Sequence, residues 1–169
     1  MNTIVAETRL AEPRDSAALA AVHEAAWRGA YAGLIPHNSL SRMIGRRHQA
    51  WWARAIRGGA AILVVEFAGE TIGYATLGDN RAEAIKAEGE IYELYIRPEY
   101  QGLGFGGRLF KAARGLLADR RLTGLVVWAL ADNHQAIDFY ARLGGADVAE
   151  GSEVFEGRNL GKIAFVWPR

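Results

Sequence analysis

The spacing of apolar residues divides this chain into short strand-like runs and helix-like runs. Leu19, Val22 and Ala26 recur at helical spacing, which predicts an amphipathic helix. Apolar runs over 60–66 and 71–77 flank a glycine-containing turn, which predicts a β-hairpin. Along the whole chain the pattern predicts a strand (4–10), helices (13–33 and 38–57), strands (60–66, 71–77 and 90–97), a helix (105–121), a strand (125–130), a helix (132–143) and a final strand pair (147–150 and 162–167).

This order of elements, βααβββαβαββ, indicates an α/β (α+β) protein with a mixed sheet and helices on it. The chain has 169 residues, of which 50% are hydrophobic and 23% charged. These values are typical of one soluble globular domain, so a single domain over 1–169 is expected.

The net charge of the chain does not exclude any class of partner, whereas its residue content excludes several kinds of site. The formal net charge is +1, so bulk charge argues neither for nor against nucleic acid. The chain has no cysteine, which excludes disulfides, thiolate metal sites and a cysteine nucleophile. The four histidines show no ligand spacing, so no metal is expected.

The sequence also predicts where the protein works. The first ten residues carry Glu7 and Arg9 and no apolar core, so no signal peptide is expected. The longest strongly apolar run, 60–65, is far too short to span a bilayer. We therefore expect a cytoplasmic protein that does not enter membranes.

The most informative segment is the glycine-rich run 101–107, which lies between a predicted strand and a predicted helix. Glycine lets backbone approach a ligand closely, and free N–H groups at a helix start bind anions. The run therefore predicts a site for a phosphate-bearing molecule. One interpretation is the dinucleotide fingerprint Gly102-x-Gly104-x-x-Gly107, which would make the protein a nucleotide-dependent oxidoreductase. Against it, residues 98–101 separate the strand from the first glycine.

The other interpretation takes the same run as Gln101-x-x-Gly104-x-Gly106 together with its flanks. Residues 94–106 and a second segment, 133–144, resemble the two signature motifs of the GNAT superfamily of acyl-CoA-dependent N-acetyltransferases. The resemblance covers nearly the whole chain. It implies the GNAT fold: a mixed, mostly antiparallel central sheet with a splayed strand pair and helices on both faces. It also implies acetyl-CoA as the acetyl donor.

The resemblance assigns the cofactor site by position. It implies that backbone N–H groups of the glycine-rich loop bind the cofactor pyrophosphate, through Gln101, Gly102, Leu103, Gly104, Phe105, Gly106 and Gly107. The bulged strand before the loop would bind pantetheine through the main chain of Leu94, Tyr95 and Ile96, and one N–H near the bulge would polarise the thioester. Asn133 matches a position that hydrogen-bonds pantetheine, although asparagine also favours helix caps.

Catalytic and acceptor residues follow in the same way. Tyr140 matches the family tyrosine that protonates the departing CoA sulfur. Glu90 matches a family position for the general base, with Glu93 or a water chain as alternatives. On a regular strand these two glutamates face opposite sides, so only one reaches the cleft unless a bulge intervenes. Trp27 and Tyr31 lie in the region that walls the acceptor site in the family.

The acceptor itself stays open. A small-molecule amine or a peptide is expected, with no nucleic acid and with a possible homodimer. Glu153 is one of several loop glutamates that would attract a cationic amine if they rim the cleft. The alternative within this fold is a non-catalytic acyl-CoA-binding sensor.

Overall fold

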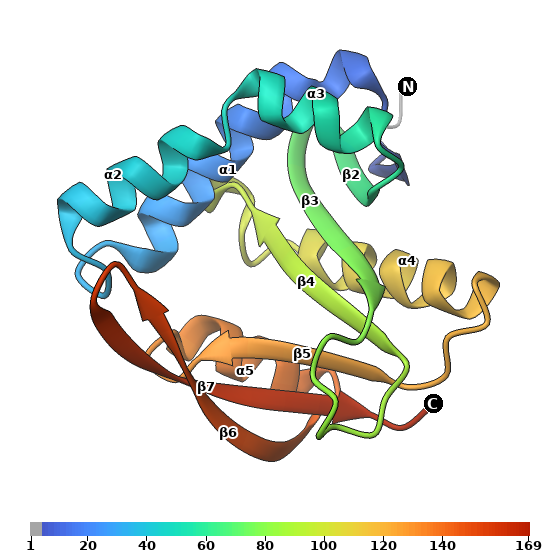
Figure 1. Cartoon of the computed structure of the whole chain (residues 1–169). Helices are drawn as coiled ribbons and strands as arrows, with labels where there is room; N and C mark the ends of the chain where they lie inside the picture. Colours follow the sequence, from blue (N-terminus) through green and yellow to red (C-terminus); the bar gives the residue numbers. More distant parts are fainter. Residues whose placement is uncertain (1–4) are drawn as a thin grey trace.

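A computed structural model describes residues 5–169 and places one seven-stranded sheet between two groups of helices (Figure 1). Helices α1 to α3 lie over one face of the sheet, and α4 and α5 lie over the other. The elements are β1 (Glu7–Leu10), α1 (Ser16–Tyr31), α2 (His37–Arg46), α3 (Gln49–Arg57), β2 (Ala61–Phe67), β3 (Glu70–Asp79), β4 (Gly89–Ile96), α4 (Phe105–Asp119), β5 (Leu125–Leu130), α5 (His134–Arg142), β6 (Ala146–Phe155) and β7 (Arg158–Trp167).

The strand order is β1-β2-β3-β4-β5-β7-β6, and every neighbouring pair is antiparallel except β4 and β5. The predicted mixed, mostly antiparallel sheet with helices on both faces is therefore confirmed. The parallel pair requires a crossover connection, which α4 provides.

Helices on both faces explain the unbroken apolar run at the start of β2. Successive side chains of a strand point to opposite faces, so a strand covered twice is apolar at every position. Leu63 and Val65 face the cluster that includes α4, whereas Ile62 and Val64 face the cluster that includes α1 and α3. The helices therefore enclose the centre of the sheet between two apolar cores.

The structure corrects three predicted elements. The expected helix 38–57 is two helices, α2 and α3, because the side chain of His48 caps a new helix by accepting a hydrogen bond from the N–H of Trp51 at 3.3 Å. The final strands are much longer than expected and form the β6–β7 hairpin. Residue 4 of the predicted first strand lies outside the described residues, and β1 begins at Glu7. No helix within residues 5–169 combines the length and apolar character needed to cross a bilayer.

The central feature of the sheet is a splay between β4 and β5. The two strands pair over only three positions, Gly89–Ile91 against Leu125–Val127, and then diverge, as Figure 1 shows. On its other side β4 carries a bulge, because Thr76 pairs with Glu93 while Leu77 pairs with Ile91. The bulge turns the strand away from β5, and the main chain of its last residues is left facing a gap.

Candidate active site

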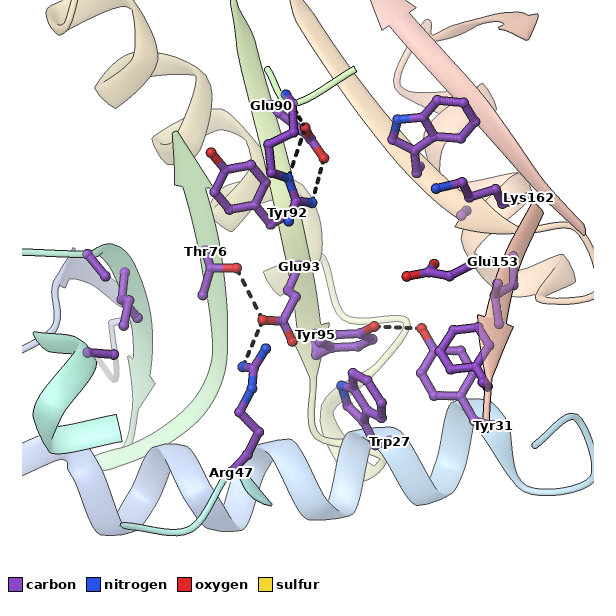
Figure 2. A pocket seen from close by; sticks show the side chains of 18 of the residues that line it. Trp27, Tyr31, Arg47, Thr76, Glu90, Tyr92, Glu93, Tyr95, Glu153 and Lys162 are labelled. Carbon is purple, nitrogen blue, oxygen red and sulfur yellow. Dashed lines mark hydrogen bonds and ion pairs between the residues drawn. The ribbon is translucent and has the colours of Figure 1, made fainter. Parts of the chain in front are cut away.

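Two hollows meet at the splay, and Tyr95 of β4 lines both of them. The smaller hollow has a volume of about 390 Å³ and lies between the end of β4, the glycine-rich loop and α5. The larger has a volume of about 630 Å³ and lies between α1, α3, β3, β4, β5 and the β6–β7 hairpin (Figure 2). We call them the loop hollow and the hairpin hollow.

The glycine-rich loop leaves the start of α4 open to a ligand. Gly102 and Gly104 have φ angles of 78° and 89°, in the left-handed region that favours glycine. Gly104 is the N-cap of α4 and supplies no side-chain hydrogen bond to it, so the first N–H groups of the helix have no intrahelical partner. A Cβ atom at Gly106 would lie 3.0 Å from the Phe139 ring, so glycine also permits close contact with α5. The result is a positively polarised helix end facing the loop hollow.

The side chains of the glycine-rich loop mainly contact the protein itself and not the loop hollow. Gln101 donates through Nε2 to the carbonyl of Ile96 at 3.0 Å, and its Oε1 accepts from Gln135 at 2.7 Å. The Leu103 side chain is 65% exposed, and that of Phe105 is buried in the core. Neither residue lines the loop hollow, whereas Gln101, Gly102, Gly104, Gly106 and Gly107 do.

Asn133 and Tyr140 both line the loop hollow, where β4 provides Leu94, Tyr95 and Ile96 as well. Asn133 caps α5 by accepting from the N–H of Ala136 at 3.2 Å, and this cap uses its amide oxygen and not its N–H donors. Tyr140 is buried among aromatic rings, and burial raises the pKa of its hydroxyl. It therefore keeps its proton at neutral pH.

Both Glu90 and Glu93 line the hairpin hollow. The bulge between them cancels the alternation of a regular strand, as Figure 2 shows. Glu90 is 2% exposed and accepts from Arg81 through the backbone N–H at 3.0 Å and through Nη2 at 2.9 Å.

Glu93 is held by three donors. It accepts from Arg47 Nη1 at 2.9 Å, from the Tyr74 hydroxyl at 2.9 Å and from Thr76 Oγ1 at 3.3 Å. An ionised carboxylate has about four lone-pair positions, so Glu93 retains capacity for one more donor from a ligand.

Trp27 and Tyr31 of α1 lie where the two hollows meet. Their side chains both line the hairpin hollow, and the Tyr31 hydroxyl is 2.6 Å from that of Tyr95. Burial raises the pKa of Tyr31 to about 12, so this pair is neutral and one hydroxyl donates to the other. The predicted position of both α1 residues beside the cleft agrees with the structure.

Several residues that line the hairpin hollow were not singled out from the sequence for this site. They include Arg47, Arg81, Tyr92, Trp128 and Lys162. These residues are far apart in the sequence and share no local motif. They come together because their strands and loops present them on the same side of the sheet, and this can be recognised only when the register of the strands is known. Of the loop glutamates, Glu153 does line the hollow.

The β6–β7 hairpin that closes this hollow is tied to α2. Glu156, in the hairpin turn, accepts from Arg42 Nη2 at 2.6 Å and from Arg46 Nη2 at 2.9 Å. The hydrogen bond from Arg42 lowers the pKa of Glu156 to about 2. We call these three residues the hairpin clasp.

Comparison with known proteins decides between the two interpretations of the glycine-rich loop. The model of the acetyltransferase (GNAT) family matches residues 19–145, well over half of the chain. The chain belongs to this family. An uncharacterized N-acetyltransferase of Bacillus subtilis, YuaI, is 27% identical to this GNAT protein over 165 residues, which cover 97% of this chain and 92% of YuaI.

Solved structures agree on the fold. A GCN5-related N-acetyltransferase from Rhodopseudomonas palustris has a TM-score of 0.78 at 24% identity and covers 100% of this chain and 99% of its own. The yncA protein of Salmonella typhimurium, solved with its cofactor acetyl-CoA, has a TM-score of 0.70 at 21% identity and covers 99% of this chain and 94% of its own. This GNAT protein is an acyltransferase, and acetyl-CoA is its acetyl donor.

The residues of the loop hollow fit this cofactor. The open α4 N-terminus and the glycines of the loop suit a pyrophosphate, and the unpaired end of β4 suits an extended pantetheine chain. Within residues 5–169, no group of three or more His, Cys, Asp or Glu side chains that could hold a metal ion is found.

Proposed function

We propose that this GNAT protein, as one catalytic domain, transfers the acetyl group directly from acetyl-CoA to an amine of a small molecule or peptide in the hairpin hollow. The observation that carries the proposal is the shared wall at Tyr95. A cofactor with its pyrophosphate at the α4 N-terminus and its pantetheine along β4 directs its thioester towards this wall. An amine in the hairpin hollow approaches from the other side.

The acceptor must first lose a proton. A lysine-like amine has a pKa near ~10.4, so only about one molecule in a few thousand is neutral at pH 7. We place Glu93 before Glu90 as the group that receives this proton, directly or through a water molecule. Glu93 lies two residues from Tyr95, whereas Glu90 lies where β4 still pairs with β5, at the closed end of the splay.

The neutral amine then attacks the thioester carbon, and the C–S bond breaks as the amide forms. Backbone N–H groups of β4 beside the gap would stabilise the negative charge on the carbonyl oxygen. Tyr140 would give its proton to the departing thiolate, and the proton that the attacking nitrogen loses as the amide forms would restore the Tyr140 hydroxyl, directly or through a water molecule. Tyr140 lines the loop hollow and its hydroxyl carries a proton at neutral pH, and these two properties support this role.

The test is release of CoA from acetyl-CoA across a panel of amines, with Tyr140→Phe as the diagnostic variant. We expect amine-dependent CoA release, and a fall in kcat of roughly 10²-fold in the variant, the usual scale of general acid catalysis. Tyr100→Phe, which removes a surface hydroxyl, is the matched control. An unchanged kcat in Tyr140→Phe would remove it from the mechanism.

If the protein binds CoA tightly but no amine in the panel causes CoA to be released from acetyl-CoA, the result would instead support the acyl-CoA-binding sensor. A homodimer and a cytoplasmic location stay predictions from the sequence.

A further inference from the structure

The charged groups of the hairpin hollow fall into two sets. On the β3–β4 side, Glu93 pairs with Arg47 and Glu90 pairs with Arg81. On the hairpin side, Glu153 and Lys162 line the hollow, and within residues 5–169 neither has an ion-pair partner within 4.0 Å. These two side chains are therefore the charges that a ligand can engage without breaking an internal pair.

Lys162 is held in place rather than left to move freely. Its ammonium nitrogen lies 4.5 Å from the centre of the Trp128 ring, a cation–π contact. Its methylene chain lies against Gly151, where an added Cβ atom would come within 3.4 Å of the Lys162 Cε and 3.3 Å of the Trp128 ring. Glycine on β6 thus makes room for a positive charge directed into the hollow, as Figure 2 shows.

Glu153 lies close to this positive charge on the same side of the hairpin. Gly151 is the register partner of Lys162, and Glu153 is two residues further along β6. Such diagonal neighbours are about 7–8 Å apart at the backbone, which leaves room for a small group between their charged ends. In Figure 2 the carboxylate of Glu153 points from β6 into the hollow, towards β4.

A neighbouring positive and negative charge match the two groups on the α-carbon of an amino acid. Resting on the proposed acetyltransferase function, we propose that the acceptor is a diamino acid. Lys162 binds its α-carboxylate, Glu153 binds its α-ammonium, and the side-chain amine reaches past Glu93 to the thioester. A simple diamine would bring a second positive charge towards Lys162, and an ω-amino acid that lacks the α-amine would leave Glu153 without a partner.

The experiment measures kcat/KM with compounds that differ by one charged group. L-lysine is compared with cadaverine, which lacks the carboxylate, and with 6-aminohexanoate, which lacks the α-amine; L-ornithine and putrescine form the shorter pair. We expect the better diamino acid to exceed its diamine and amino-acid counterparts by at least about tenfold, because a hydrogen bond to a charged group contributes roughly a 10- to 100-fold change.

Two variants assign the groups. Lys162→Met is expected to reduce kcat/KM for the diamino acid by about 10- to 100-fold. For cadaverine, whose second positive charge Lys162 repels, kcat/KM is expected to stay the same or to rise. Glu153→Gln is expected to reduce kcat/KM for the diamino acid and to leave kcat/KM for 6-aminohexanoate unchanged. Lys86→Met and Asp147→Asn remove the same charges outside the hollow and serve as controls.

The outcomes separate this inference from the function on which it rests. Equal kcat/KM for diamino acid and diamine, or equal losses for both in Lys162→Met, would overturn the inference and leave acetyltransfer intact. If no amine releases CoA, the acetyltransferase function fails, and calorimetric titration of the CoA-loaded protein with L-lysine and L-ornithine then decides the recognition. If L-lysine or L-ornithine binds and this binding is lost in Lys162→Met, the proposed recognition of a diamino acid is supported. If neither compound binds, the proposal is overturned.

Discussion

The buried imidazole of His23 makes a quantitative prediction about acid stability. His23 lies on α1, is 1% exposed and contacts the rings of Trp27, Trp52 and Tyr74. Neither of its ring nitrogens has a hydrogen-bond partner in the part of the chain that the structure describes. Burial, with a smaller contribution from the nearby Arg47 charge, lowers the pKa of His23 from 6.5 to about 3.

The sign of the effect follows from proton uptake. Between pH 6.5 and about 3 the unfolded chain binds a proton at His23 that the folded chain does not bind. The free energy of unfolding therefore falls as the pH is lowered through this window. At 1.36 kcal/mol for each pH unit, His23 alone removes about 2 kcal/mol between pH 8 and pH 5.

Urea unfolding at several pH values between 5 and 8 measures this loss. His23→Phe keeps a buried ring without a titrating group, so its stability is expected to fall by about 2 kcal/mol less than that of the native chain over the same range. The difference in pH slope is the readout, because any packing change from the new ring is the same at every pH. His37→Gln, at an exposed position, is the control. Parallel pH curves for His23→Phe and the native chain would refute the reasoning.

Three further predictions concern the site and its surroundings. Glu93→Gln should lower kcat at neutral pH by roughly 10²-fold and Glu90→Gln by much less; a steady-state comparison that gives the larger fall for Glu90→Gln would move the base to that residue. Gly104→Val forces a branched side chain into a left-handed backbone and should weaken CoA binding at least about tenfold by calorimetry. The control is Gly115→Ala in α4, which should retain normal affinity for CoA and stabilise the helix by up to about 1 kcal/mol. Normal CoA affinity in Gly104→Val would contradict the assignment of the loop to the cofactor pyrophosphate. Glu156→Gln breaks the hairpin clasp, so amide hydrogen exchange at the β6–β7 turn should become faster; an unchanged exchange rate there would show that the clasp does not restrain the hairpin.

Much of the fold could be predicted because its local signals agree with its tertiary structure. The strand at 125–130 and the helix that begins at Phe105 have the predicted start, since apolar periodicity and the glycine segment both mark them. The final strand pair was predicted, but the length of the β6–β7 hairpin was underestimated because β6 is exposed along most of its length and shows no apolar alternation. The break between α2 and α3 was missed because a histidine supplies the cap, and histidine is not among the preferred capping residues.

The site divides in a similar way. The loop hollow is encoded by contiguous motifs, so its residues could be named from the sequence. In the hairpin hollow, the prediction that only one of Glu90 and Glu93 reaches the cleft depended on a regular strand, and the bulge at Tyr92 brings both into it. Lys162 and Trp128 become neighbours only through the pairing of β5 with β7, which no local pattern specifies.

The position of Tyr95 also has a consequence for inhibition. Because this one side chain borders both hollows, a single compound that occupies them together must pass its ring. A bisubstrate adduct, with the CoA sulfur joined through a short linker to an amino-acid head group, would follow that route. Its linker length would be set by the passage beside the Tyr31–Tyr95 hydroxyl pair, and joining the two halves would gain affinity without any new contact.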